Sequence, residues 1–323
     1  MNVTQARELA AGLLGRPVNA AQAVGRGGNN RIFAIDAGTE RLALKSYPPQ
    51  AEDPRDRLGQ EWQALSFLAG HGLPVPQPVA ADPARHAALY TWIDGRPLEP
   101  ADDGVAAMGA LFARLQALRG EATDLREGST PVFTAEQAER QFAERLAPLA
   151  DIPPLAGHLA DIRGSADRAF ARARARLRTG FTTPSTRVLS PSDFGRHNML
   201  ATPSGLVFLD FEYFGWDGPE KAIADTMLHP GSAFSAPERD RLKDLMLAAL
   251  PDEPGLALRL EAMIPLFGLI WCLILLNEFR PDRRARRGLV AGSAEARAAE
   301  TRQLEKSRSL LSWLEDAHDL APA

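Results

Sequence analysis

Three polar side chains within residues 192–215 have types and spacing that suit work on a phosphate group. Asp193 and Asn198 lie five positions apart in a polar loop, and Asp210 ends the apolar run LVFLD, 17 residues after Asp193. A carboxylate at the mouth of a buried strand is costly unless it is paired or bound to a metal ion. Oxygens from Asn198 and Asp210, with phosphate oxygens, suit Mg²⁺, which needs few protein ligands. Asp193 is then free to accept or orient the proton of a hydroxyl group.

A lysine and a glutamate earlier in the chain extend this pattern. Lys45 (in LALKSY) lies in an expected strand, as either an edge-strand charge or a point charge directed at phosphate. Glu61 follows on an expected helix, where it either pairs with Lys45 or is a solvated surface glutamate. Residues 24–33 (VGRGGNNRIF) contain Gly27 and Gly28, whose backbone N–H groups can approach an anion or simply form a turn. Each signal is weak alone, and their order along the chain is the informative feature.

The hydrophobic pattern around these side chains predicts an α+β chain. Strands are expected at residues 30–36, 41–47, 87–93, 187–189 and 206–209. Helices are expected at residues 4–14, 57–68, 105–118, 134–149 and 159–177, then from residue 220 onward, including 239–250, 256–278 and 294–314. Thr4 is the expected N-cap of the first helix. We therefore expect a small β-rich lobe, residues 1–95, and a larger, mainly helical lobe, residues 96–323.

The composition of the 323-residue chain excludes several classes of protein. A formal charge of −4 offers no general attraction for nucleic acid or an anionic membrane. The single cysteine, Cys272, cannot form an internal disulfide or a multi-thiolate zinc site, which favours a cytoplasmic location. The apolar run 263–276 contains Pro265 and is too short for a membrane span, so it predicts a buried helix.

The ordered set of motifs resembles the aminoglycoside phosphotransferase and choline kinase-like family, which has the bilobal protein-kinase-like fold. The resemblance covers about residues 24–225: glycine-rich hairpin, strand lysine, helix glutamate, the D-x-x-x-x-N segment and the strand aspartate. Residues 72–80 (GLPVPQPVA) and 89–98 (LYTWIDGRPL) resemble the stretch that connects the lobes in this family. Residues 208–225 resemble its metal-binding strand and the loop that follows.

The resemblance implies a role for each matching position. Residues that would bind ATP are Gly27, Gly28, Asn29, Lys45, Glu61, Thr91 and Ile93. Within that set the glycine turn would cover the phosphates, Glu61 would brace Lys45, and the backbone near Thr91 would meet the adenine. Asn198 and Asp210 would ligate Mg²⁺, and Asp193 would be the catalytic base.

One position departs from the family pattern. Members usually carry a histidine two residues before the catalytic aspartate, and here Pro191 and Ser192 precede Asp193. The leading hypothesis is a kinase that transfers the γ-phosphate of ATP to a hydroxyl of a sugar, an aminoglycoside or an amino alcohol. The alternative is a nucleotide-binding pseudokinase with a regulatory or assembly role. A protein kinase is disfavoured because Phe211 and Glu212 follow Asp210 and no Ala-Pro-Glu segment follows.

The sequence leaves the acceptor and the oligomeric state open. Aromatic and acidic residues that either line an acceptor pocket or belong to the core are Glu212, Tyr213, Phe214, Trp216, Asp217, Trp271 and Glu278. Carboxylates and aromatic faces of this kind would suit a cationic acceptor.

Overall fold

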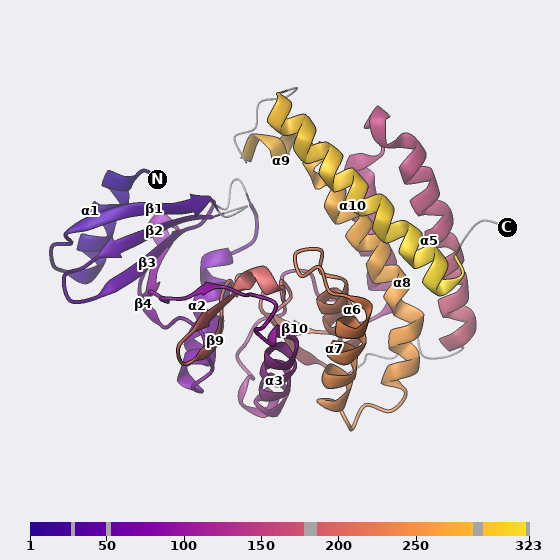
Figure 1. Cartoon of the computed structure of the whole chain (residues 1–323), viewed down its shortest axis with the longest axis horizontal. Coiled ribbons are helices and arrows are strands. Elements are labelled where there is room, and N and C mark those ends of the chain that lie inside the picture. The colour runs from indigo at the N-terminus through magenta and orange to yellow at the C-terminus, as the bar shows by residue number, and fades with distance from the viewer. Residues whose placement is uncertain (27–29, 50–52, 178–185, 287–292, 321–323) are drawn as a thin grey trace. The chain divides into compact units, whose positions relative to one another are not determined.

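The computed structural model describes the chain except residues 27–29, 50–52, 178–185, 287–292 and 321–323 (Figure 1). One compact unit contains Met1–Thr130 and Ser190–Gly215, and the other contains Pro131–Leu189 and Trp216–Ala323. These two units are defined by how closely their residues pack together, not by the functions of their residues. The division of roles near residues 94–97 therefore stays a prediction.

The first unit is built on a five-stranded antiparallel sheet. Its strands are β1 (Ala20–Arg26), β2 (Arg31–Asp36), β3 (Arg41–Ser46), β4 (Pro78–Asp82) and β5 (Ala87–Thr91), in the order β1-β2-β3-β5-β4. Alternate residues of a strand face opposite sides of the sheet. Leu42 and Leu44 of β3 accordingly belong to a buried cluster with Leu9 of helix α1 (Val3–Leu14). Lys45 comes next on β3 and therefore points to the other face.

Two helices and a small sheet complete the first unit. Helix α2 (Arg57–Gly70) contacts β4 and β5, and α3 (Gly104–Ala117) follows the short strand β6 (Arg96–Pro97). The small sheet has the order β6-β8-β9, with β8 at Met199–Thr202 and β9 at Gly205–Phe208. Since β8 and β9 form an antiparallel hairpin, they bring the segments before Met199 and after Phe208 side by side.

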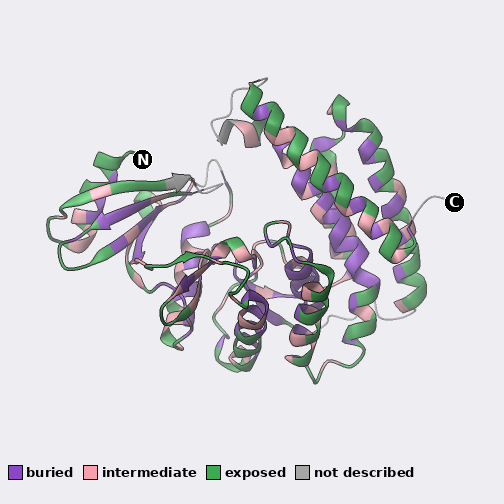
Figure 2. Cartoon of the chain, in the orientation of Figure 1, coloured by how far each residue is buried: buried purple, intermediate pink, exposed green. Residues whose placement is uncertain are grey.

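The second unit is mainly helical. Its α-helices are α4 (Ala135–Leu146), α5 (Ala156–Leu177), α6 (Pro219–Leu228), α7 (Ala236–Ala248), α8 (Leu256–Leu275), α9 (Pro281–Arg286) and α10 (Ala294–His318). Helix α8 lies at its centre and packs against α4, α5, α6 and α10. Figure 2 shows buried residues along most of α8. Gly268 permits the close approach of α10, because a Cβ there would lie 2.6 Å from Leu314.

Shorter elements join these helices and strands. Two short strands, β7 (Val188–Ser190) and β10 (Gly215–Asp217), form a separate pair. The 3₁₀ helices are Pro83–Arg85, Arg119–Glu121, Ala147–Leu149, Pro153–Leu155, Arg196–Asn198 and Leu276–Phe279.

The segment Leu256–Phe279 is the one part of the described chain that is long and apolar enough to cross a membrane. In the most apolar window of this segment, 78% of the residues are buried inside the protein. The prediction of a buried helix around residues 263–276 is therefore confirmed. Burial of this kind is typical of the central helix of a packed domain.

Most predicted elements are confirmed to within a few residues, and the errors have simple causes. Asn2, rather than Thr4, caps α1, because its side chain accepts the N–H of Gln5 in a reciprocal capping box. Strand β1 was expected only as the first arm of the glycine-rich hairpin at residues 24–33, and strands β4, β6, β8 and β10 were not predicted. Several of them are only two to four residues long, which is too short for a period of two to be read.

Candidate active site

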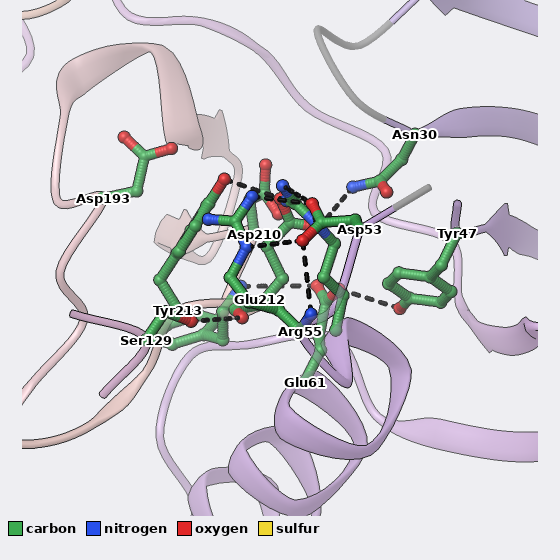
Figure 3. A network of polar contacts seen from close by, with 12 residues as sticks. Asn30, Tyr47, Asp53, Arg55, Glu61, Ser129, Asp193, Asp210, Glu212 and Tyr213 are labelled. Carbon is green, nitrogen blue, oxygen red and sulfur yellow. Dashed lines mark hydrogen bonds and ion pairs between the residues drawn. The ribbon is translucent and has the colours of Figure 1, made fainter. Parts of the chain in front are cut away.

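Lys45 lies at the centre of a cluster of three carboxylates in the first unit. Its Nζ is 2.6 Å from Asp210 Oδ1, 2.7 Å from Glu61 Oε2 and 3.9 Å from Glu212 Oε2. Figure 3 shows these acidic side chains converging from helix α2 and from the segment after β9. The ion pair expected between Lys45 and Glu61 is present, and Asp210 shares the same ammonium group.

Burial and mutual repulsion shift the titration of this cluster. Burial raises the pKa of Glu61 to about 7, against the opposing attraction of Lys45. Burial likewise raises the pKa of Glu212. Burial alone would lower the pKa of Lys45, but Asp210, Glu61 and Glu212 together hold it well above its usual value. The site therefore keeps a charged ammonium among an excess of acidic groups, which favours the binding of a cation beside it.

The backbone at Asp210 turns sharply, and Glu61 holds the turn. Asp210 has φ +63°, in the left-handed region that aspartate tolerates better than most residues. The next residue, Phe211, donates its N–H to Glu61 Oε1 at 3.3 Å. The Asp210 side chain is 33% exposed, while the side chains of Glu61 and Glu212 are 3% and 2% exposed. Asp210 is thus the carboxylate of this cluster that is accessible to a ligand.

The loop that carries Asp193 is tied to the same segment. Asn198 donates its Nδ2 to the carbonyl oxygen of Asp193 at 2.9 Å, and its own carbonyl accepts the N–H of Leu209 at 2.8 Å. These bonds fix Asn198 beside the residue that precedes Asp210. Because Nδ2 of Asn198 is engaged, its Oδ1 is the atom oriented to serve as a ligand. The carboxylate of Asp193 lies on this loop (Figure 3), and His197 Nε2 is 3.8 Å from its Oδ1.

Two serines support the loop where the family's histidine is missing. Ser192 donates its N–H to Ser190 Oγ at 3.1 Å and its hydroxyl to the carbonyl of Tyr213 at 3.1 Å. Ser192 also has φ +63°, and the N–H of Asp193 bonds to the carbonyl of Pro191 at 2.8 Å. The loop is therefore a tight turn held by hydrogen bonds of the hydroxyl groups of Ser190 and Ser192.

The end of β5 offers a free backbone group at the expected adenine position. Thr91 donates its N–H to Gln77 at 2.9 Å, and Trp92 donates its N–H to Arg41 at 3.3 Å. The N–H of Ile93 has no acceptor among the residues that the structure describes. An unpaired donor at this edge is suited to a ring nitrogen acceptor of a nucleobase.

The structure brings together most, but not all, of the residues predicted for the site. Lys45, Glu61 and Asp210 are in direct contact, and Asn198 is adjacent through the β8–β9 hairpin. The predicted phosphate-covering residues Gly27, Gly28 and Asn29 lie outside the described residues. They remain a prediction.

Several contributors to the cluster were missed. The unrecognised residues are Asn30, Tyr47, Asp53, Arg57 and Tyr90. Tyr47 donates its hydroxyl to Glu61 at 2.8 Å, and Asn30 donates to Glu212. For Asn30 the sequence carried one signal, because this polar residue stands directly before strand β2.

Some of the residues suggested for an acceptor pocket are buried in the protein core instead. Phe214 is 1% exposed and Glu212 is 2% exposed, so neither lines a pocket. Asp217 is fully buried, where it accepts the N–H of Val132 and pairs with Lys221 at 2.9 Å. For these residues the core interpretation is the correct one.

Comparison with known proteins identifies the family. A family model described as APH, the phosphotransferase enzyme family, matches residues 20–259. A search of curated proteins finds no significant match. Among solved structures, choline kinase LicA from Streptococcus pneumoniae aligns with a TM-score of 0.65 and 16% identity, over 96% of this chain and 98% of that one.

Two further structures share the fold. A choline/ethanolamine kinase family protein from Mesorhizobium loti gives a TM-score of 0.64 and 20% identity, over 98% of this chain and 97% of that one. A spectinomycin phosphotransferase, solved with ADP and spectinomycin, gives 0.63 and 10%, over 96% of this chain and 98% of that one. The protein therefore belongs to the phosphotransferase enzyme family, and it is a phosphotransferase with the protein-kinase-like α+β fold.

Proposed function

We propose that the protein transfers the γ-phosphate of ATP, as its Mg²⁺ complex, to a hydroxyl group of a sugar, an aminoglycoside or an amino alcohol. The observation that carries the proposal is the Lys45 ammonium, which lies 2.7 Å from Glu61 and 2.6 Å from Asp210. Phosphoryl transfer depends mainly on positioning and on charge neutralisation, and this arrangement supplies a fixed cation beside an accessible carboxylate.

The donor atoms near Asp210 fit a magnesium ion. Asn198 Oδ1 and the Asp210 carboxylate are hard oxygen ligands, and Mg²⁺ is commonly held by one or two such groups plus phosphate oxygens and waters. When bound, the ion would neutralise charge on the phosphates. The excess of carboxylates around Lys45 supports the presence of a further positive charge at this place.

The other predicted site residues can each be given a role in phosphate transfer from ATP. Lys45 would contact the α- and β-phosphates when it exchanges part of its bond with Asp210 for the nucleotide. The N–H of Ile93 would donate to the adenine, while Gly27, Gly28 and Asn29 would cover the phosphates. Asp193 would accept or orient the proton of the acceptor hydroxyl.

The proposed acceptor class rests on what the structural neighbours are described as acting on. The neighbours named above are described as kinases of choline, of choline or ethanolamine, and of spectinomycin. All of these acceptors carry hydroxyl and amino or ammonium groups. An amino alcohol or an aminoglycoside is therefore the first class to test.

The experiment is ADP formation from Mg·ATP across a panel of choline, ethanolamine, spectinomycin and hexoses. We expect turnover with at least one acceptor, and we expect Asp193→Ala to lower kcat by about 10²- to 10⁴-fold while nucleotide binding is kept. Asp240→Ala, at an exposed position of α7, is the matched control. Nucleotide binding without turnover on any acceptor would support the pseudokinase alternative, and equal turnover in Asp193→Ala would refute the role of Asp193.

A further inference from the structure

Glu212 differs from its neighbour Asp210 in having both carboxylate oxygens engaged inside the protein. Its Oε1 is paired with Arg57 Nη1, and its Oε2 accepts Nδ2 of Asn30. Lys45 Nζ is farther from Glu212, at 3.9 Å. With a side chain only 2% exposed, Glu212 is saturated and buried, whereas Asp210 is partly open.

Arg57 is fixed from several sides at the first position of α2. Its Nε and Nη2 donate to Asp53 Oδ2 at 2.8 and 2.7 Å. Its Nη1 donates to Tyr213 OH at 2.8 Å, and its guanidinium carbon lies 5.0 Å from the centre of that ring. A buried guanidinium with this many planar contacts is held in one orientation.

The balance of charges explains why the pairing of Arg57 with Glu212 matters at this site. Glu61, Asp210 and Glu212 each have an oxygen within 4.8 Å of the others. Lys45 lies within 4 Å of all three carboxylates, and Arg57 is closer to Glu212 than Lys45 is. A second cation that pairs with one carboxylate leaves Lys45 to the other two. Breaking a buried pair of this kind would leave an uncompensated carboxylate at the site.

We propose that Arg57 is a positioning residue that keeps Glu212 neutralised and away from the divalent cation, so that Asp210 is the cation-binding carboxylate of the two. This inference rests on the proposed function for the identity of the ligand. Removal of the Arg57 charge should release Glu212, which would bind the divalent ion more tightly and draw Lys45 away from the nucleotide.

Arg55 provides a matched control two positions away. It also donates to Asp53, at 2.8 and 2.6 Å, and it lies over the same Tyr213 ring at 5.2 Å. Its side chain is 28% exposed, and the structure gives it no contact with Glu212. Arg55→Gln therefore removes an arginine from the same network without releasing Glu212.

The test measures Mn²⁺ binding without nucleotide by electron paramagnetic resonance, and binding of a non-hydrolysable ATP analogue with Mg²⁺ by calorimetry. We expect Arg57→Gln to tighten Mn²⁺ binding and to weaken analogue binding, each by about fivefold, through the unpaired charge of Glu212. Arg57→Lys and Arg55→Gln should change both by less than about twofold. The double variant Arg57→Gln/Glu212→Gln should return Mn²⁺ binding to the wild-type value.

Two single variants decide the inference even if Arg57→Gln does not fold. Asp210→Asn should abolish Mn²⁺ binding, whereas Glu212→Gln should leave it within about twofold of wild type. An equal loss of Mn²⁺ binding in Asp210→Asn and Glu212→Gln would show that Glu212 is also a ligand and would overturn the inference. Identical behaviour of folded Arg57→Gln and Arg55→Gln would also overturn it. If wild type binds Mn²⁺ but no nucleotide, the proposed function fails, while these comparisons still decide the role of Arg57.

Discussion

The hydroxyl of Tyr47 donates to Glu61 Oε2 across 2.8 Å, on the same carboxylate oxygen that receives the Lys45 ammonium. Tyr47 also shares a hydrogen bond of 2.7 Å with Tyr90. Tyr213, the third and last tyrosine of the chain, bonds to Arg57 in the same network. The tyrosines thus supply neutral donors and acceptors around a buried group of charges, which limits the cost of burying them.

Removal of the Tyr47 hydroxyl should weaken the support of Glu61. We expect Tyr47→Phe to lower the free energy of unfolding by about 1–2 kcal/mol, because a buried carboxylate loses a donor and Tyr90 loses its partner. Urea unfolding of the apoprotein measures this. Tyr90→Phe is the control: it leaves Glu61 its donor, so an equal or larger loss in that variant would contradict the role given to Tyr47.

Replacement of Lys45 should affect catalysis far more than replacement of the partly exposed Lys243. We expect Lys45→Met to lower kcat/KM for ATP by about 10²- to 10³-fold, since the phosphates lose a preorganised charge. Lys243→Met removes a partly exposed lysine that lies 3.5 Å from Asp240 and should change kcat/KM by less than about twofold. Steady-state kinetics with saturating acceptor decide the comparison. Similar kcat/KM values for Lys45→Met and Lys243→Met would show that Lys45 does not act on the nucleotide.

The serine-braced loop should depend on Ser192. Its hydroxyl bonds to the carbonyl of Tyr213 at 3.1 Å, and Ser192→Ala removes that bond without a change in the backbone preference at φ +63°. We expect kcat to fall about tenfold with KM for ATP unchanged, because a loose loop misplaces Asp193 more than it affects the nucleotide. Ser204→Ala, in the exposed turn between β8 and β9, serves as the control. A change in KM alone would show that Ser192 does not act through Asp193.

A buried histidine in the second unit should give the stability a pH dependence. His158 lies 2.8 Å from Ser307 Oγ, and burial lowers its pKa. In the unfolded chain histidine titrates near pH 6.5, so below about pH 6.5 the unfolded state binds more protons than the folded state. The stability from His158 is therefore present above that pH and is lost as the pH falls through the lower, folded value. Urea unfolding of His158→Gln should show a flatter pH dependence between about pH 5 and pH 6.5.

His71 provides a control of opposite sign for this experiment. The carbonyl of Phe67 and the carboxylate of Glu121 raise the pKa of His71. Its contribution is therefore present below the unfolded pKa and is lost as the pH rises through the folded value. His71→Gln should therefore make the stability fall less steeply as the pH rises above about 6.5. A slope that changes in the same direction in both variants would contradict this explanation.

The residues that carry chemistry were predictable because each stands out locally. Lys45 is a charge within an apolar strand, Asp210 ends another apolar run, and Asp193 and Asn198 share a five-residue spacing in a polar loop. That Lys45 and Asp210 belong to one site follows from the family's order of motifs. For the same reason the α+β fold class could be predicted before any element was observed.

The residues that support the site could not be predicted in the same way. Arg57 and Glu212 form an ion pair across 155 positions of the chain, and in sequence each has the pattern of an ordinary surface charge. The sequence suggests Glu212 as a candidate for an acceptor pocket, because it follows Asp210 and precedes aromatic residues. Only the folded arrangement of α2 beside the segment after β9 shows that its charge is already paired.

The central claim is that Lys45 and Asp210 form one site for a nucleotide and a divalent cation. Calorimetric titration of a non-hydrolysable ATP analogue, with and without Mg²⁺, tests it in the wild type and in Asp210→Asn. The account predicts that Mg²⁺ strengthens binding to the wild type by at least about tenfold and does not strengthen binding to Asp210→Asn. Wild-type binding that is indifferent to Mg²⁺, or an equal effect of Mg²⁺ in the variant, would contradict it.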